Sequence, residues 1–389
     1  MSRNAAATVP SLVLAGLATW ACAGTPAQDP GAGAGARSGS AAVGERAPAS
    51  RHVVYVANES SDVVSRVAFT APAHLELLRD IPVGRMPGDI DGAHGLQASP
   101  DGRYWYLTIA HGQPFGTVWK FDSAADTVVG SAEVGMFPAT MGITPDGQYL
   151  FVVNFNLHGD PEPSTVSVVH AQTMTELARP VACVRPHGSR VDASGTKNYV
   201  ACVGSDQIVE IDTRSFEVSG RFSVVPGAEG VPLGTDPAEA RSNECAPTWV
   251  TPGVAARAGF LYVPCNRRAE VLEIDAREWR VTRRFPTGEG PYNLEITPDG
   301  ATLVASLKGA RQIAVFDLDA GVERARLETA ETLPHGVAIS PDGRWAFVSN
   351  EAVGAKPGTL DVFDLVALRR VASLPLGLQS GGITLVRAE

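Results

Sequence analysis

Three of the eight histidines in this chain share one sequence context. His94, His187 and His335 each precede a glycine, and each stands at the start of a short apolar segment. Imidazole nitrogens bind copper, zinc and haem iron. If the three segments converge, they would form a metal or haem site, to which His111 would add a fourth imidazole.

Other polar residues are expected beside these histidines. A ligating imidazole needs an acceptor on its second nitrogen, and Asp89, Asp91 and Glu351 are candidates for that role. Tyr292 occupies the histidine position of another segment, and Lys308 maps to the same rim. In the alternative, structural interpretation, each imidazole hydrogen-bonds the backbone of a neighbouring segment. The sequence contains no G-x-S-x-G, H-E-x-x-H or C-x-x-C-H motif, so it assigns no catalytic residue and no covalent haem.

The segments that would position these residues belong to a repeat. Its marker, Ser/Thr-Pro-Asp-Gly, occupies residues 99–102, 144–147, 297–300 and 340–343, with degenerate copies at 192–195 and 251–253. Proline presets φ and glycine supplies a positive φ, so each marker predicts a tight turn. The markers recur every ~50 residues, which is typical of a repeat architecture.

Each turn joins two β-type runs, and a third strand that often ends in Asp and a weaker fourth strand follow. Four antiparallel strands per repeat are typical of a propeller blade. Six blades are expected to begin near His94, Ala139, His187, Ala246, Tyr292 and His335. Residues 53–58 and 382–386 would share the seventh blade and close the ring without an open edge. The sequence therefore predicts an all-β, seven-bladed propeller.

The second strand of several blades carries a short motif. It reads Tyr55-Val-Ala-Asn58, Phe151-Val-Val-Asn154 and Phe347-Val-Ser-Asn350. These motifs resemble the YVTN-repeat family of exported β-propellers, and the likeness covers residues 52–389. The wider group includes surface-layer proteins, lactonase-type hydrolases and the haem-d1-binding domain of nitrite reductases. The resemblance implies the fold and says little about function.

Blade geometry places the long insertions on one side of the ring. The innermost strands begin on the face that we call the top face, and the Pro-Asp-Gly turns lie on the opposite, bottom face. Residues 84–93, 156–164 and 226–243 are expected in top-face loops. Elaborated loops on a rigid scaffold usually mark the binding side.

The four cysteines beyond residue 23 are predicted to form two disulfides, Cys183–Cys202 and Cys245–Cys265. In each pair the first cysteine precedes an innermost strand, and the second replaces the motif Asn of the same blade. Metal ligation by thiolates is the alternative, but no C-x-x-C spacing supports it.

The N-terminal region predicts export. Arg3 and the apolar residues 9–18 are typical of a signal peptide, assigned to residues 1–23. The composition of residues 24–50 predicts a flexible Ala/Gly/Pro-rich tether, and residues 51–389 are assigned to the propeller. Ala21-Cys22-Ala23 fits ordinary cleavage, whereas a lipidated Cys22 would tether the protein to a membrane. The expected location is the periplasm or cell envelope.

A net charge of −10 without a basic run argues against nucleic-acid binding. The preferred function is a non-enzymatic binding or scaffold module whose top face takes a protein, peptide, glycan or small ligand. One alternative is a metal- or haem-binding propeller, resembling cytochrome d1, with a redox or cofactor-handling role. Another is a lactonase-like hydrolase that uses His187, His335 and Glu351.

Overall fold

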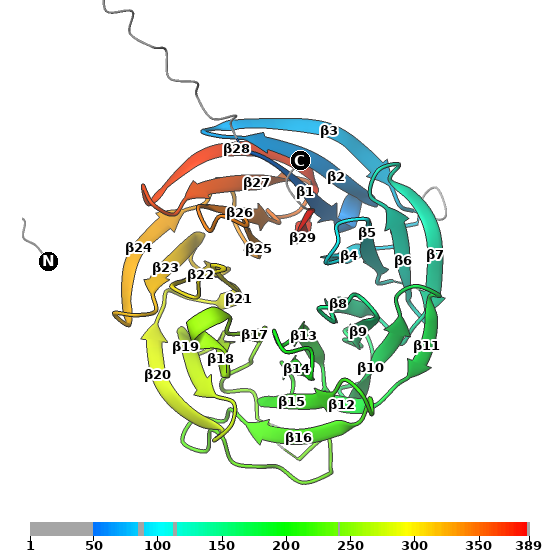
Figure 1. Ribbon diagram of the computed structural model, residues 1–389, viewed down its shortest axis with the longest axis vertical. Helices are drawn as coiled ribbons and strands as arrows, with labels where there is room; N and C mark the ends of the chain where they lie inside the picture. Colours follow the sequence, from blue (N-terminus) through cyan, green and yellow to red (C-terminus); the bar gives the residue numbers. More distant parts are fainter. Residues whose placement is uncertain (1–49, 85–88, 112–114, 240–241, 387–389) are drawn as a thin grey trace, which may run out of the picture. The chain divides into compact units, whose positions relative to one another are not determined.

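The computed structural model describes residues 50–84, 89–111, 115–239 and 242–386, which form seven antiparallel sheets around a central axis. Figure 1 shows the sheets as the blades of a ring, with the innermost strands lining the centre. The predicted fold class is confirmed. The signal peptide, Cys22 and nearly all of the tether lie outside the described residues.

Blade 1 joins the two ends of the described chain. It contains β29 (Ser380–Val386), β1 (Arg51–Asn58), β2 (Val63–Thr70) and β3 (His74–Pro82), in that order from the axis outward. The short 3-10 helix η1 (Glu59–Ser61) connects β1 to β2. Strands β29 and β1 pair from Val53↔Val386 to Asn58↔Ser380, so the predicted closure is confirmed.

Blades 2 to 4 follow in chain order. Blade 2 contains β4 (Ala93–Ala98), β5 (Tyr104–Ile109), β6 (Thr117–Asp122) and β7 (Thr127–Glu133). Blade 3 contains β8 (Pro138–Ile143), β9 (Tyr149–Asn154), β10 (Pro163–His170), β11 (Thr175–Ala178) and β12 (Val181–Val184). Blade 4 contains β13 (Pro186–Val191), β14 (Lys197–Cys202), β15 (Gln207–Asp212) and β16 (Val218–Ser223).

Blades 5 to 7 complete the ring. Blade 5 contains β17 (Thr251–Pro252), the 3-10 helix η2 (Ala255–Arg257), β18 (Phe260–Cys265), β19 (Glu270–Asp275) and β20 (Arg280–Pro286). Blade 6 contains β21 (Pro291–Ile296), β22 (Thr302–Leu307), β23 (Gln312–Asp317) and β24 (Val322–Glu328). Blade 7 contains β25 (Pro334–Ile339), β26 (Trp345–Asn350), β27 (Pro357–Asp364) and β28 (Arg369–Leu378).

The repeated motifs have local structural roles. In the first Pro-Asp-Gly turn, Gly102 has φ +71°, and its amide donates to the Ser99 carbonyl at 2.9 Å. The Ser99 hydroxyl donates to Asp101 at 2.7 Å and accepts the Tyr104 amide at 2.9 Å. The motif residue Asn58 is buried and donates to the Ser65 hydroxyl of the next strand at 2.9 Å. These bonds lie within one blade, which explains why the motifs predict the fold and not the ligand.

Two blades depart from the regular pattern. In blade 3 the outer strand is split into β11 and β12, both paired with β10, because Pro180 between them has no N–H to donate. In blade 5 the innermost strand is only Thr251–Pro252, preceded by an isolated bridge between Pro247 and Cys265. A blade was expected to begin near Ala246, and its regular pairing starts later than that.

Both predicted disulfides are present. Cys183 bonds Cys202, and Cys245 bonds Cys265, with sequence separations of 19 and 20. Cys183 lies in β12, which pairs with blade 3, so the first bridge also ties blade 3 to blade 4 and is not confined to one blade. Disulfides persist in oxidising compartments, so the pair fits an exported protein. In the described part of the chain, no helix has the length and apolarity required to span a membrane.

Candidate functional site

The three predicted histidines meet at the top of the channel. His94, His187 and His335 are the second residues of β4, β13 and β25. The ring centroid of His94 lies 6.3 Å from that of His187 and 6.1 Å from that of His335. The structure therefore brings the three imidazoles into one cluster, which we call the channel-mouth cluster.

A sharp turn brings each innermost strand to the axis. The residue directly before six of these strands has a positive φ: Gly92, Phe137, Arg185, Gly290, Leu333 and Gln379. Hydrogen bonds to the next blade then fix the position of the strand along the channel axis. The Thr108 hydroxyl accepts the Gly95 amide at 2.7 Å and donates to the Ala139 carbonyl of the next blade at 3.0 Å.

The glycine after each histidine is required by packing. A Cβ on Gly95 would lie 2.1 Å from the Ala139 carbonyl oxygen, and one on Gly188 would lie 2.7 Å from the Trp249 Cα. Neighbouring blades approach so closely here that only glycine fits. The His-Gly pair thus combines a packing requirement with a side chain that faces the channel mouth.

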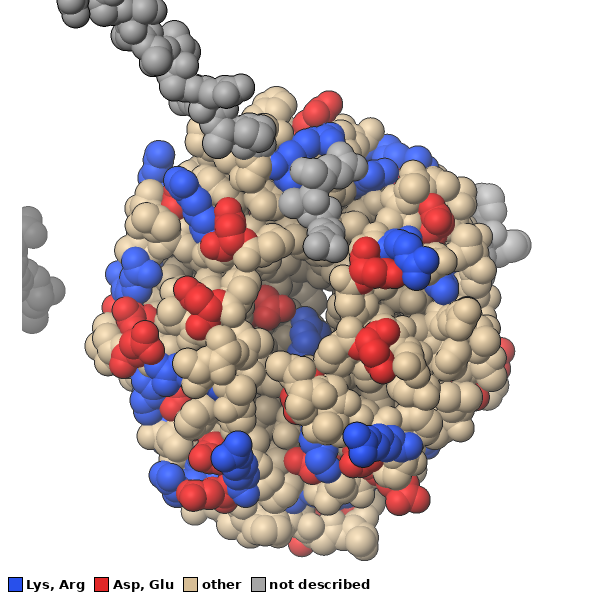
Figure 2. Space-filling model, in the orientation of Figure 1, with Lys and Arg blue, Asp and Glu red and all other residues tan. Residues whose placement is uncertain are grey.

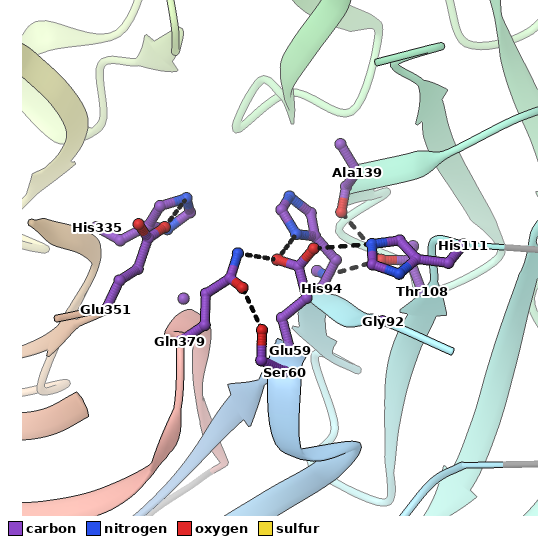
Figure 3. A network of polar contacts seen from close by, with 12 residues as sticks. Glu59, Ser60, Gly92, His94, Thr108, His111, Ala139, His335, Glu351 and Gln379 are labelled. Atoms are coloured by element: carbon purple, nitrogen blue, oxygen red, sulfur yellow. Dashed lines mark hydrogen bonds and ion pairs between the residues drawn. The ribbon is translucent and has the colours of Figure 1, made fainter. Parts of the chain in front are cut away.

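Glu59, in η1, is the central acceptor of this cluster (Figure 3). Its carboxylate accepts from His94 Nδ1 at 2.8 Å, His111 Nε2 at 3.1 Å and Gln379 Nε2 at 3.0 Å. Burial opposes the charged form, but the contacts with the two histidines outweigh it and lower the pKa of Glu59 below its usual range. Glu59 is therefore a buried carboxylate at neutral pH.

His111 sits between two acceptors. Its Nε2 faces Glu59, and its Nδ1 faces the Ile90 carbonyl oxygen at 3.1 Å. Both contacts require an N–H, so the geometry favours the imidazolium form. The hydrogen bond to Glu59 raises the pKa of His111, in agreement with that assignment.

His187 is held as the neutral tautomer. Its Nδ1 donates to the Thr248 carbonyl at 2.8 Å, and its Nε2 accepts from the Tyr292 hydroxyl at 3.0 Å. Burial is the main cause that lowers the pKa of His187 to about 3. The bond to Thr248 is the neighbouring-backbone contact of the structural interpretation, so that interpretation describes His187 well.

Glu351 holds the opposite side of the mouth. Its Oε1 accepts from Lys308 Nζ at 2.9 Å and lies 3.5 Å from His335 Nε2. The Lys308 ammonium also lies 4.4 Å from the Tyr292 ring centroid, a cation–π distance. Burial, followed by the charge of Lys308, lowers the pKa of His335 well below its usual value, so this ring is neutral.

The hydrogen-bond acceptors that the sequence predicted for the histidine rings agree only in part with those in the structure. Glu351 reaches a histidine, but Asp89 is exposed and Asp91 supports His111 through its backbone carbonyl. Glu59 was not among the residues predicted from the sequence, although its position after a motif asparagine could have indicated it. Glu59 follows the motif residue Asn58 as Glu351 follows Asn350, so the two carboxylates hold the same position in adjacent blades.

The side chains of the channel-mouth cluster suit a site in which one histidine binds a haem iron better than a site in which several side chains hold a free metal ion. Within the described ranges, no three His, Cys, Asp or Glu side chains are arranged to hold a metal ion. His94 Nε2 is buried with no hydrogen-bond partner among the described residues, as is His335 Nδ1, but only His94 has its other ring nitrogen hydrogen-bonded to a carboxylate, at 2.8 Å. Figure 3 shows this ring directed toward the axis of the propeller, with Nδ1 on Glu59. A neutral imidazole with Nδ1–H on a carboxylate presents its Nε2 lone pair as a metal ligand does.

Space beneath the cluster is small. The cavity between His94, His335 and Trp249 has a volume of about 20 Å³, enough for one water molecule. A larger ligand must therefore approach His94 from the top face, past a rim that includes Glu59, Lys308 and Glu351.

Comparison with known proteins finds distant relatives of this ring. No family model matches the chain. The protein NirF of Pseudomonas aeruginosa is 25% identical over 281 residues, which span 69% of this chain and 63% of NirF. The matched stretch therefore covers less than two thirds of that relative.

Solved structures share the architecture. Dihydro-heme d1 dehydrogenase NirN, in complex with DHE, is 17% identical with a TM-score of 0.57, covering 85% of this chain and 74% of its own. Periplasmic gluconolactonase PpgL of Pseudomonas aeruginosa is 18% identical with a TM-score of 0.63, covering 87% and 99%. At these identities the likeness concerns the fold. The chain is a seven-bladed β-propeller whose fold is similar to those of NirN and PpgL.

Proposed function

We propose that this protein is an exported binding propeller whose top face holds an iron tetrapyrrole, with His94 Nε2 as the axial ligand. One observation carries the proposal: this nitrogen is buried without a partner while Glu59 holds the other nitrogen of the ring. A buried nitrogen without a hydrogen bond is costly. Coordination to iron would satisfy it.

The residues around His94 suit such a ligand. The Glu59 carboxylate fixes the His94 tautomer and makes Nε2 more electron-rich, as carboxylate partners do for metal-bound histidines. His187 and His335 remain neutral at pH 7 because burial lowers their pKa values, so they add no positive charge beside a metal. A bound iron would supply redox or ligand-binding chemistry that these side chains lack.

The relatives support the same ligand class. NirN, which shares the fold, is a dihydro-heme d1 dehydrogenase whose structure contains DHE. Because His94 Nε2 is covered in this structure, binding must displace a neighbouring side chain. The aromatic rings nearest to His94 are those of Phe137, His335 and His187.

The proposal is tested by titrating the purified protein with haemin and following the Soret band. We expect one haemin per chain, and binding at least tenfold weaker in His94→Ala. His74→Ala is the matched control, because His74 is exposed on the outer strand β3. Equal binding by wild type and His94→Ala, or no binding by wild type, would refute the role of His94.

A second candidate function is hydrolysis of a lactone. The observation in its favour is the Lys308–Glu351–His335 group, which places a neutral imidazole, a carboxylate and an ammonium at one mouth. Hydrolysis of glucono-δ-lactone that is lost in His335→Ala and kept in His74→Ala would support it. An inactive wild-type protein would exclude that substrate.

Export and anchoring belong to the same proposal. Residues 1–23 would direct export, and the tether would place the propeller in the periplasm or envelope. Mass spectrometry of the mature protein from a bacterial host distinguishes the two N-termini. A lipid on Cys22 indicates an anchored protein, and a free N-terminus at the predicted cleavage site indicates a soluble one.

A further inference from the structure

A second cavity occupies the lower half of the channel, below the channel-mouth cluster. Its volume is about 360 Å³, within the range of small-molecule sites. Its wall is mixed: apolar side chains from different innermost strands, including Leu96, Val337 and Ile383, lie beside polar ones such as Gln97 and Thr384. The face seen in Figure 2 is hollowed at the centre of the ring, and both basic and acidic atoms are visible inside the hollow.

Two opposite charges project into this cavity. Arg190 comes from β13 of blade 4, and Glu295 comes from β21 of blade 6. They approach each other across blade 5, whose innermost strand, Thr251–Pro252, lies between the other two. Their side chains retain 23% and 29% exposure, so both charges are accessible from the channel.

The two charges do not satisfy each other. Arg190 Nη2 lies 3.8 Å from Glu295 Oε1, which is beyond hydrogen-bond distance. Arg190 is fixed on its other side, because Nη1 donates to the Ser189 carbonyl at 3.0 Å and the guanidinium stacks 4.6 Å from the Trp249 ring centroid. Burial raises the pKa of Glu295 despite the neighbouring arginine, which agrees with an incomplete ion pair.

This arrangement selects for a ligand that carries both charges. A simple anion would satisfy Arg190 and leave Glu295 unpaired, and a simple cation would do the reverse. A charge left unpaired in a partly buried site weakens binding. A zwitterion pairs with both groups at once, and its apolar part can pack against the cavity wall.

We propose that the lower channel cavity binds a small zwitterion of the α-amino acid class. The ligand carboxylate pairs with Arg190 and the ligand ammonium with Glu295. The aliphatic side chain packs against Leu96, Val337 and Ile383. The proposal is independent of the tetrapyrrole site, because none of these contacts involves His94 or Glu59.

Isothermal titration of the full chain with L-leucine tests this assignment. We expect saturable binding, and binding at least tenfold weaker in Glu295→Gln and in Arg190→Gln. Arg284→Gln is the matched control, because Arg284 pairs with Glu229 and Glu270 away from the channel. Circular dichroism and thermal melts verify that each variant is folded.

Two analogues keep the test decisive even if a variant fails to fold. 4-Methylpentanoate lacks the ammonium of leucine, and isoamylamine lacks the carboxylate, so each should bind wild type at least tenfold more weakly than leucine. The proposal is overturned if no aliphatic amino acid binds below ~5 mM. It is equally overturned if either analogue binds as well as leucine, or if both variants bind leucine as wild type does.

Discussion

Acid should destabilise this propeller through His187. The buried His187 ring is neutral, with Nδ1 donating to Thr248 and Nε2 accepting from Tyr292. Its pKa is lowered to about 3, mainly by burial, whereas the pKa of a histidine in the unfolded chain is near 6.5. Between these values the unfolded chain binds a proton that the native protein does not. Native stability from this group is therefore present above pH 6.5 and is lost as the pH falls.

The magnitude follows from proton linkage. One proton difference changes the free energy of unfolding by about 1.4 kcal/mol per pH unit. From pH 6.5 to 4.5 the loss due to His187 should approach ~2–3 kcal/mol. In His187→Gln the side chain stays neutral, so this part of the pH dependence should disappear.

The assay is urea unfolding with intact disulfides at several pH values between 4.5 and 7.5. Glu59, whose pKa is lowered, contributes stability that is lost only below its unfolded value of 4.5, outside this window. His111, whose pKa is raised, contributes stability that is fully present below pH 6.5 and is lost at higher pH. Glu59 and His111 are unchanged in His187→Gln, so their contributions are the same in both proteins. His74→Gln serves as the control because His74 is exposed. Equal pH slopes for wild type and His187→Gln would refute the reasoning.

Three other predictions concern the site and its support. Replacing Glu59 by Gln should lower the pKa of His111, because the carboxylate partner of His111 is lost, and NMR titration of the histidines measures this change. The same substitution should destabilise the fold by ~2–4 kcal/mol, which urea unfolding measures. The Cys183→Ser/Cys202→Ser double variant should lose about 3 kcal/mol, the loop-closure value for a 19-residue separation, and an unchanged urea midpoint would contradict this. Gly95→Ala should be poorly folded, because its Cβ would meet a carbonyl oxygen of the next blade at 2.1 Å, and a wild-type melting temperature would show that the blades can separate.

The architecture could be predicted because its determinants are local. A Pro-Asp-Gly turn needs its proline and glycine, and the motif Asn58 bonds Ser65 within the same blade, so these features recur visibly in the sequence. The disulfide pairs could also be predicted, because Cys202 and Cys265 replace the motif Asn at positions that pair with the start of the blade.

The polar contacts of the site could not be predicted in the same way. The Glu59–His94 bond joins blade 1 to blade 2, so it depends on how two blades pack together and not on a motif within one blade. Arg190 and Glu295 come from blades 4 and 6, so their approach depends on the closed ring and is not visible in any one repeat. Both contacts are made between blades.

The most direct test of the tetrapyrrole assignment is to identify the nitrogen that binds the iron. Pulsed EPR of the haemin complex, prepared with ¹⁵N-histidine, reports the hyperfine coupling of a coordinating imidazole. The account predicts a strongly coupled histidine nitrogen in wild type, in His74→Ala and in His187→Gln, and its loss in His94→Ala. A coupling that persists in His94→Ala, or one that is absent from the wild-type complex, would contradict the assignment of His94 as the axial ligand.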